Sequence, residues 1–129
     1  MFANTKATNG FAVDDIEAAK RFYGETLGLG TTELSEEHGL ISIQLAGGRD
    51  TLVYRKDDFT PATYTILNFP VDDIDSAVDE LAERGVRFEQ YEGFAQDEKG
   101  ISRDPNGPPI AWFRDPAGNI LSVLENGAS

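Results

Sequence analysis

The side chains that most often perform catalysis are scarce in this sequence. It has no cysteine and one histidine, His38, which lies beside Glu36 and Glu37 in a stretch typical of a solvated loop. No Ser-His or Cys-His pair is present to build a nucleophile. The Gly-rich segment Ala46–Arg49 lacks the GxxxxGK[ST] pattern of a phosphate loop and predicts a hairpin turn instead. The sequence does not exclude a carboxylate that acts as a general base, because a shifted pKa cannot be recognised from sequence alone.

Charge and hydropathy restrict the kinds of partner. The formal net charge is -12, with 11 Lys and Arg against 23 Asp and Glu. This balance argues against nucleic acid and against an anionic membrane, since both require clusters of basic residues. No apolar run approaches the roughly 20 residues that span a bilayer, and the first residues lack a signal-peptide pattern. We therefore expect a cytoplasmic protein, whose acidity suits either a cationic small ligand or simply solubility.

A repeat divides the chain into two halves. The stretch Phe11–Ala19 recurs as Phe69–Ala77, with Phe, Val, Asp, Asp, Ile and Ala in the same places. Each copy predicts a strand followed by a helix. An aspartate, Asp15 in the first half and Asp73 in the second, is placed to cap that helix.

Glycines and apolar alternation predict the remaining elements. Gly28 and Gly30 predict the end of the first helix, and Gly85 predicts the end of the second. The further strands expected from the pattern are residues 40–45, 51–54, 86–88, 109–114 and 120–125. The second half is thus a strand, a helix and three strands, and we expect the same order in the first half. Residues 57–63 are predicted as a linker, and the Gly- and Pro-containing residues 93–108 as a long loop and partly ordered lid.

Two motifs near opposite ends of the chain carry a family resemblance. Val13–Tyr23, followed by Leu27 and Gly28, resembles the opening signature of vicinal oxygen chelate modules. Ala111–Leu121 resembles the closing signature of the same modules. The superfamily includes glyoxalases, bleomycin-resistance proteins and dioxygenases, so the resemblance indicates a fold but no single activity.

The resemblance implies an α+β fold made of two βαβββ modules. The first module is expected at residues 5–56 and the second at residues 64–126, within a single domain of residues 1–129. Their sheets would form a cupped half-barrel that holds the ligand. Members of this size usually form homodimers, which we expect here as well.

The resemblance also locates the positions at which the family's metal enzymes bind a divalent ion. Those positions hold Thr8, its equivalent Ile66, Ser122 on the last strand, and one residue of 52–54. None of them is His, Asp, Glu or Gln, the side chains that such a site requires. Glu125 has the opposite pleat parity from Ser122, so we expect it to face away from the cup. We therefore predict no metal, no cofactor and no catalytic residue.

The side chains expected to face the cup are mostly aromatic or neutral polar. The candidate ligand-binding residues are Ser42, Gln44, Tyr54, Asn68, Phe94, Trp112, Arg114 and Ser122. Apolar walls with a few orienting polar groups are typical of a binding pocket. For Trp112 and Tyr54, packing in the core is the competing interpretation.

The leading hypothesis is a metal-independent small-molecule-binding protein that resembles the bleomycin-resistance branch. It would sequester an antibiotic or metabolite of planar or cationic character, with neither nucleic acid nor membrane as partner. One alternative is a glyoxalase-like lyase or isomerase, or a dioxygenase, with a non-standard active site. Another is a regulatory module with a vestigial cup.

Overall fold

The computed structural model describes residues 1–126, so residues 127–129 of the predicted domain lie outside the described residues. The chain divides into two compact units, with the boundary between Thr60 and Pro61. One unit contains a four-stranded sheet and the other a three-stranded sheet. Helices accompany each sheet, which makes the fold α+β, as predicted. Within residues 1–126 no helix is long and apolar enough to cross a membrane.

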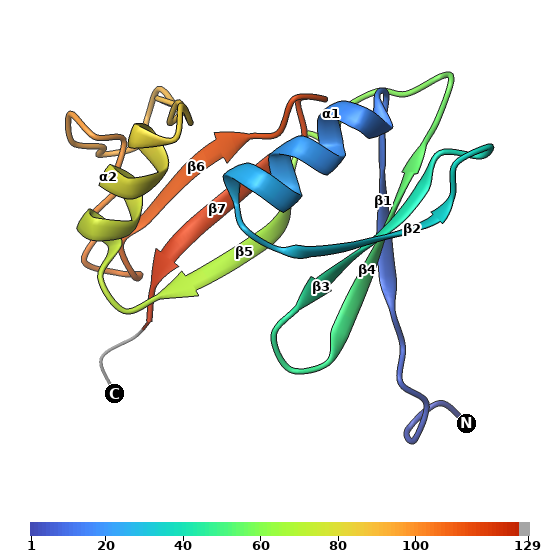
Figure 1. The fold of residues 1–129 in the computed structure, drawn as a ribbon. Coiled ribbons are helices and arrows are strands. Elements are labelled where there is room, and N and C mark those ends of the chain that lie inside the picture. The colour runs from blue at the N-terminus through green and yellow to red at the C-terminus, as the bar shows by residue number, and fades with distance from the viewer. Residues whose placement is uncertain (127–129) are drawn as a thin grey trace. The chain divides into compact units, whose positions relative to one another are not determined.

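The first unit has the predicted βαβββ order (Figure 1). Its sheet order is β1-β4-β3-β2, with β1 parallel to β4 and the other pairs antiparallel. The elements are β1 (Asn9–Val13), α1 (Ile16–Lys20), the π-helical segment η1 (Arg21–Thr26), β2 (Gly30–Ser35), β3 (Leu40–Leu45) and β4 (Arg49–Arg55). The buried face of this sheet carries Val13, Ile41, Ile43 and Val53, each at most 1% exposed.

The aspartates of the repeat cap the first α-helix of each unit, as predicted. Asp15 Oδ1 accepts hydrogen bonds from the backbone N–H groups of Glu17 and Ala18, at 3.0 and 3.1 Å. Asp73 Oδ1 accepts from the backbone N–H of Ser76 at 3.2 Å. These bonds satisfy amides that have no partner inside the helix.

The first helix ends in a π-helical turn, which the sequence pattern did not predict. The Leu27 N–H donates to the Phe22 carbonyl at 2.9 Å, which is the wider spacing of a π-helix. Gly28 follows with φ of 74°, which confirms the predicted stop. The predicted stop at Gly30 is wrong, because Gly30 is the first residue of β2. A Cβ at this position would lie 2.6 Å from Gln44 Oε1 on the neighbouring strand.

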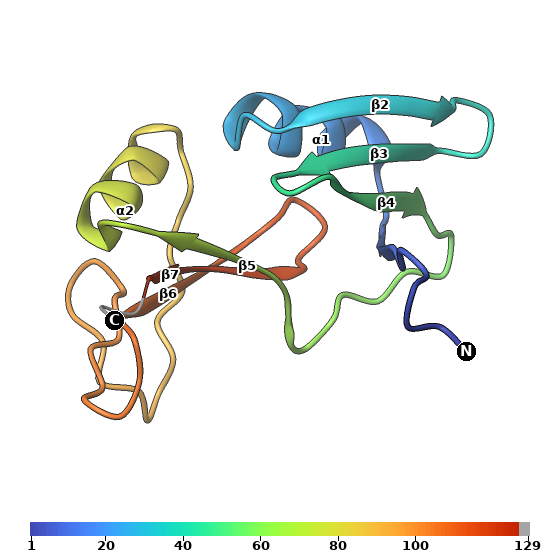
Figure 2. The same ribbon diagram turned by 90° about the horizontal axis from the view of Figure 1, so that it is seen from below.

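The second unit has one helix packed on one face of its sheet (Figures 1 and 2). The sheet order is β5-β7-β6, with β5 parallel and β6 antiparallel to the central β7. The elements are β5 (Thr65–Val71), α2 (Ile74–Glu83), β6 (Ile110–Arg114) and β7 (Ile120–Glu125). The core buries Ile74, Val78, Phe113, Leu121 and Val123, each at most 3% exposed.

The strand predicted at residues 86–88 is wrong as a full strand, because it is reduced to one bridge between Phe88 and Phe113. The Glu89 N–H still donates to the Trp112 carbonyl at 2.8 Å. The Glu89 carbonyl, however, accepts from the side-chain amide of Gln96 at 2.8 Å. A side chain thus satisfies the backbone group that a longer ladder would have paired.

Part of the loop predicted at residues 93–108 is tied to α2. The Arg103 Nη2 donates to both carboxylate oxygens of Asp75, at 2.9 Å each. Lys99 Nζ lies 3.0 Å from the Asp79 carboxylate. Exposed ion pairs of this kind contribute little individually to folding stability. Their effect is therefore local, and a lid function stays a prediction that concerns the end of the loop near Phe94.

Replacing Arg103 with alanine should release this part of the loop from α2 without unfolding the protein. Hydrogen bonding to Arg103 holds the pKa of the Asp75 carboxyl below its ordinary value. The stabilisation is therefore complete at neutral pH and is lost as the pH falls through that lowered pKa. The protection factor of the Ile101 amide, measured by hydrogen exchange, should fall in the variant. Lys56→Ala, which removes an exposed ion pair with Asp58, is the control, and equal protection in both variants would contradict the tie.

Candidate ligand-binding site

The candidate residues of the second module share the face of the sheet opposite α2. The strand register aligns Asn68, Ser122 and Trp112 in one row across β5, β7 and β6. Arg114 lies in the next row, beside Ile120. Directly paired residues of a sheet project to the same side, so the four candidates face the same way.

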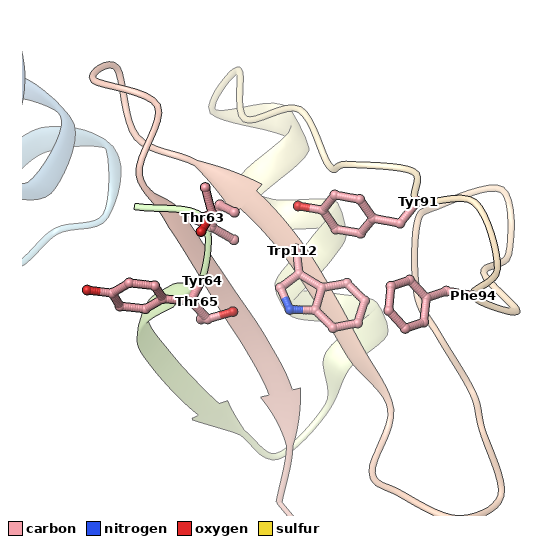
Figure 3. Close-up of a pocket in the computed structure, with 7 residues that line it drawn as sticks. Thr63, Tyr64, Thr65, Tyr91, Phe94 and Trp112 are labelled. Carbon is pink, nitrogen blue, oxygen red and sulfur yellow. The ribbon is translucent and has the colours of Figure 1, made fainter. Parts of the chain in front are cut away.

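A hollow of about 250 Å³ opens on this face around Trp112 (Figure 3). The rings of Tyr91 and Phe94 pack against the indole, with centroid distances of 5.6 and 5.4 Å. The residues that line the hollow are Thr63, Tyr64, Thr65, Tyr91, Phe94, Trp112 and Ile120. Aromatic walls with hydroxyl groups at the edge suit a flat ligand that carries polar substituents.

Asn68 and Ser122 lie beside the hollow rather than in its lining. Ser122 is 0% exposed, and its hydroxyl donates a hydrogen bond to Asn68 Oδ1 on the adjacent strand. The sequence suggested that Asn68 needs a polar partner, and Ser122 is one. The oxygen of the Asn68 amide is therefore satisfied within the sheet.

Arg114 is held in place by other groups of the second unit. Its Nε donates to Glu89 Oε1 at 2.6 Å, and its Nη1 donates to the Gly118 carbonyl at 3.0 Å. The Glu89–Arg114 pair lies near Tyr91 and affects its phenol. Burial raises the pKa of Tyr91, the Glu89 carboxylate raises it further, and the Arg114 cation opposes both effects. Tyr91 therefore keeps its proton through the physiological range.

The candidate residues of the first module lie on a second, separate sheet face. Ser42 is paired with Leu52, and both line a hollow of about 310 Å³. Gln44 and Tyr54 share the parity of Ser42 but lie outside that lining. Tyr54 is 40% exposed, so its interpretation as a core residue is wrong, and the buried residue of β4 is Val53.

The residues at the family's metal positions do not form a set of ligands. The Ser122 hydroxyl is bonded to Asn68, and Ile66 is apolar. Glu125 Oε2 accepts from the Ile74 N–H at 3.2 Å, so this carboxylate faces α2, as its pleat parity predicted. Within residues 1–126 no group of 3 or more His, Cys, Asp or Glu could hold a metal ion, and His38 is exposed. The residues present therefore do not fit the family's metal centre.

Two residues important for the shape of the hollow were missed by sequence reasoning. One is Tyr91, and the other is Gln96, which braces the segment that carries the aromatic wall. Gln96 Oε1 accepts from the Tyr91 N–H at 2.6 Å. Its Nε2 donates to the carbonyls of Glu89 and Gly100, both at 2.8 Å. These contacts lie within a loop whose conformation no sequence motif indicates. The roles of Tyr91 and Gln96 could therefore not be predicted.

Replacing Gln96 with alanine should weaken ligand binding at the hollow by about 3- to 10-fold, the equivalent of roughly one hydrogen bond. Without this side chain, Tyr91 and Phe94 lose the brace that orders them before the ligand binds. Equilibrium dialysis with a planar aromatic ligand would measure the change. Gln90→Ala is a matched control, since Gln90 makes a single 3.3 Å bond in the same loop. Equal losses in the two variants would argue against a positioning role for Gln96.

The sequence matches the model of the Glyoxalase/Bleomycin resistance protein/Dioxygenase superfamily over residues 7–123. This chain therefore belongs to that superfamily, as its two terminal motifs predicted. A comparison with curated proteins found no match.

Solved structures with the same fold differ in their described roles. A superfamily member from Sphaerobacter thermophilus DSM 20745 is 27% identical, with a TM-score of 0.67, and the match covers 93% of this chain and 97% of that one. TnmS3, an antibiotic binding protein from Streptomyces sp. CB03234, is 26% identical, with a TM-score of 0.64 and coverage of 96% and 98%. Lactoylglutathione lyase from Agrobacterium tumefaciens is 23% identical, with a TM-score of 0.65 and coverage of 96% of both chains. The last similarity concerns the fold alone.

Proposed function

We propose that this protein is a metal-independent small-molecule-binding protein that sequesters a planar antibiotic or metabolite, in the manner of the bleomycin-resistance branch. The observation that carries the proposal is the hollow in which Tyr91 and Phe94 pack around Trp112. A flat ligand on the indole would gain both apolar burial and ring stacking. The similarity to TnmS3, described as an antibiotic binding protein, supports the same assignment.

A positive charge on the ligand would add to the attraction. The formal net charge of -12 raises the local concentration of cations around the protein. An indole face also attracts a cation through its quadrupole, by about 0.5–2 kcal/mol depending on exposure. Planar cationic compounds are therefore the first ligands to test.

The proposal also concerns the cellular location, the oligomeric state and the partners of the protein. We propose a cytoplasmic homodimer that binds neither nucleic acid nor membrane. Light scattering of the purified protein would test the dimer, and a monomer at micromolar concentration would contradict it.

The test of the proposed function is equilibrium dialysis with proflavine, a planar aromatic cation, in the presence of EDTA. We expect saturable binding that EDTA does not alter. Spermidine, which is cationic but not aromatic, should compete no better than salt of equal ionic strength. Binding that disappears with EDTA and returns with zinc or nickel would favour a metal-dependent enzyme instead. The absence of saturable binding to the folded protein would contradict the proposal for this ligand class.

A further inference from the structure

The Tyr91 hydroxyl is a buried polar group with an unmet hydrogen-bonding capacity. Among residues 1–126 it makes no hydrogen bond of ordinary geometry, although the Arg114 guanidinium lies close enough to lower its pKa. Folded proteins pair nearly all such groups, because an unpaired one loses its bonds to water without compensation. A buried group of this kind in the wall of a pocket is a candidate for a contact with the ligand.

Neither charged neighbour of Tyr91 accepts its proton in this structure. Arg114 carries only donors, so even a contact from its guanidinium would reach the phenol oxygen and leave the phenol proton unused. The Glu89 carboxylate has acceptors and is paired with Arg114 at 2.6 Å, but it makes no hydrogen bond with the Tyr91 hydroxyl. Because burial raises the pKa of Tyr91, its hydroxyl remains a donor at neutral pH.

The geometry directs this donor along the hollow. Figure 3 shows the Tyr91 ring beside Trp112, with the hydroxyl oxygen toward the side on which Thr63 lies. Tyr64 also lines the hollow, but its hydroxyl points away from Trp112. The side chain of Tyr64 is mostly exposed, at 69%, so its hydroxyl can be hydrated by solvent.

We propose that the ligand of this hollow is a planar aromatic compound with an oxygen acceptor, such as a ring carbonyl, to which the Tyr91 hydroxyl donates. The inference rests on the proposed function and adds the chemical class of the ligand. Trp112 provides affinity for any flat ring system. Tyr91 then discriminates in favour of the oxygenated one, because an analogue without the acceptor leaves the hydroxyl unpaired.

The experiment compares fluorenone with fluorene, two flat tricyclic compounds that differ at one position, a carbonyl in place of a methylene. Equilibrium dialysis gives the affinity of each for the wild type, for Tyr91→Phe and for the control Tyr64→Phe. We expect the wild type and Tyr64→Phe to prefer fluorenone by about 3- to 10-fold, the range of one net hydrogen bond. In Tyr91→Phe the preference should vanish, with fluorene bound at least as well as by the wild type.

A second readout is independent of any ligand. Because the hydroxyl proton has no acceptor among residues 1–126, Tyr91→Phe should have a melting temperature no lower than that of the wild type. A lower melting temperature would mean that the hydroxyl already has a partner, which would overturn the inference. Equal binding of the two compounds by the wild type, or a preference kept in Tyr91→Phe, would overturn it while leaving stacking on Trp112 intact. If neither compound binds the folded wild type while proflavine does, this inference fails and the proposed function stands. If proflavine does not bind either, the proposed function fails as well.

Discussion

Trp112→Ala is expected to lower the affinity for planar ligands by about 30-fold or more, the size of effect typical of a central aromatic contact. The indole is the surface on which Tyr91 and Phe94 both pack, at centroid distances of 5.6 and 5.4 Å. Its removal eliminates the floor of the hollow and loosens both neighbouring rings. Equilibrium dialysis with proflavine would measure the loss.

Two further variants test whether the loss of affinity comes from the aromatic face of Trp112. Trp112→Phe keeps an aromatic face and should retain part of the affinity that Trp112→Ala loses. Phe2→Ala removes an exposed aromatic side chain outside the hollow and should bind like the wild type. An affinity of Trp112→Ala within threefold of the wild type would show that the ligand binds elsewhere.

Phe113→Ala is expected to destabilise the protein by about 3–5 kcal/mol, as is typical for a large side chain lost from a core. Phe113 is 0% exposed and packs on Phe88 with a ring-centroid distance of 5.6 Å. Its neighbour Trp112 projects from the opposite face of β6 and is only partly buried. Trp112→Ala should therefore lower the free energy of unfolding less than Phe113→Ala does, although it should lower ligand affinity more.

Urea denaturation followed by circular dichroism would measure both changes without relying on the indole. Phe113→Leu keeps most of the apolar volume and should show a smaller loss, which guards against a variant that does not fold. A greater loss of stability in Trp112→Ala than in Phe113→Ala would mean that the assignment of the two faces of β6 is reversed.

The elements of the fold that the sequence predicted correctly depend on local chemistry. Asp15 and Asp73 precede their helices directly, and the bonds that they accept come from amides of the first turn. The side chains of Trp112 and Ser122 share a sheet face because strand parity follows from simple counting. Such signals lie within a few residues of the feature that they predict.

The features that were missed depend on contacts across the chain. Nothing near Gly30 indicates that Gln44 of the neighbouring strand would occupy the space that a Cβ at position 30 would need. Gln96 forms hydrogen bonds with Glu89 and Tyr91, directly after residues 86–88, which were predicted as a strand. The position of Tyr91 in the wall of the hollow follows from the same contacts. Sequence reasoning therefore located Trp112 in the floor of the candidate site and Phe94 in its wall, but not Tyr91.

The claim on which the account depends most is that a planar ligand binds against Trp112. This residue is the only tryptophan, so the nitrogen-15 spectrum contains a single indole N–H signal. Titration of labelled protein with proflavine, in the presence of EDTA, should shift this signal progressively until it saturates. An indole signal that stays in place while proflavine binds would contradict the account.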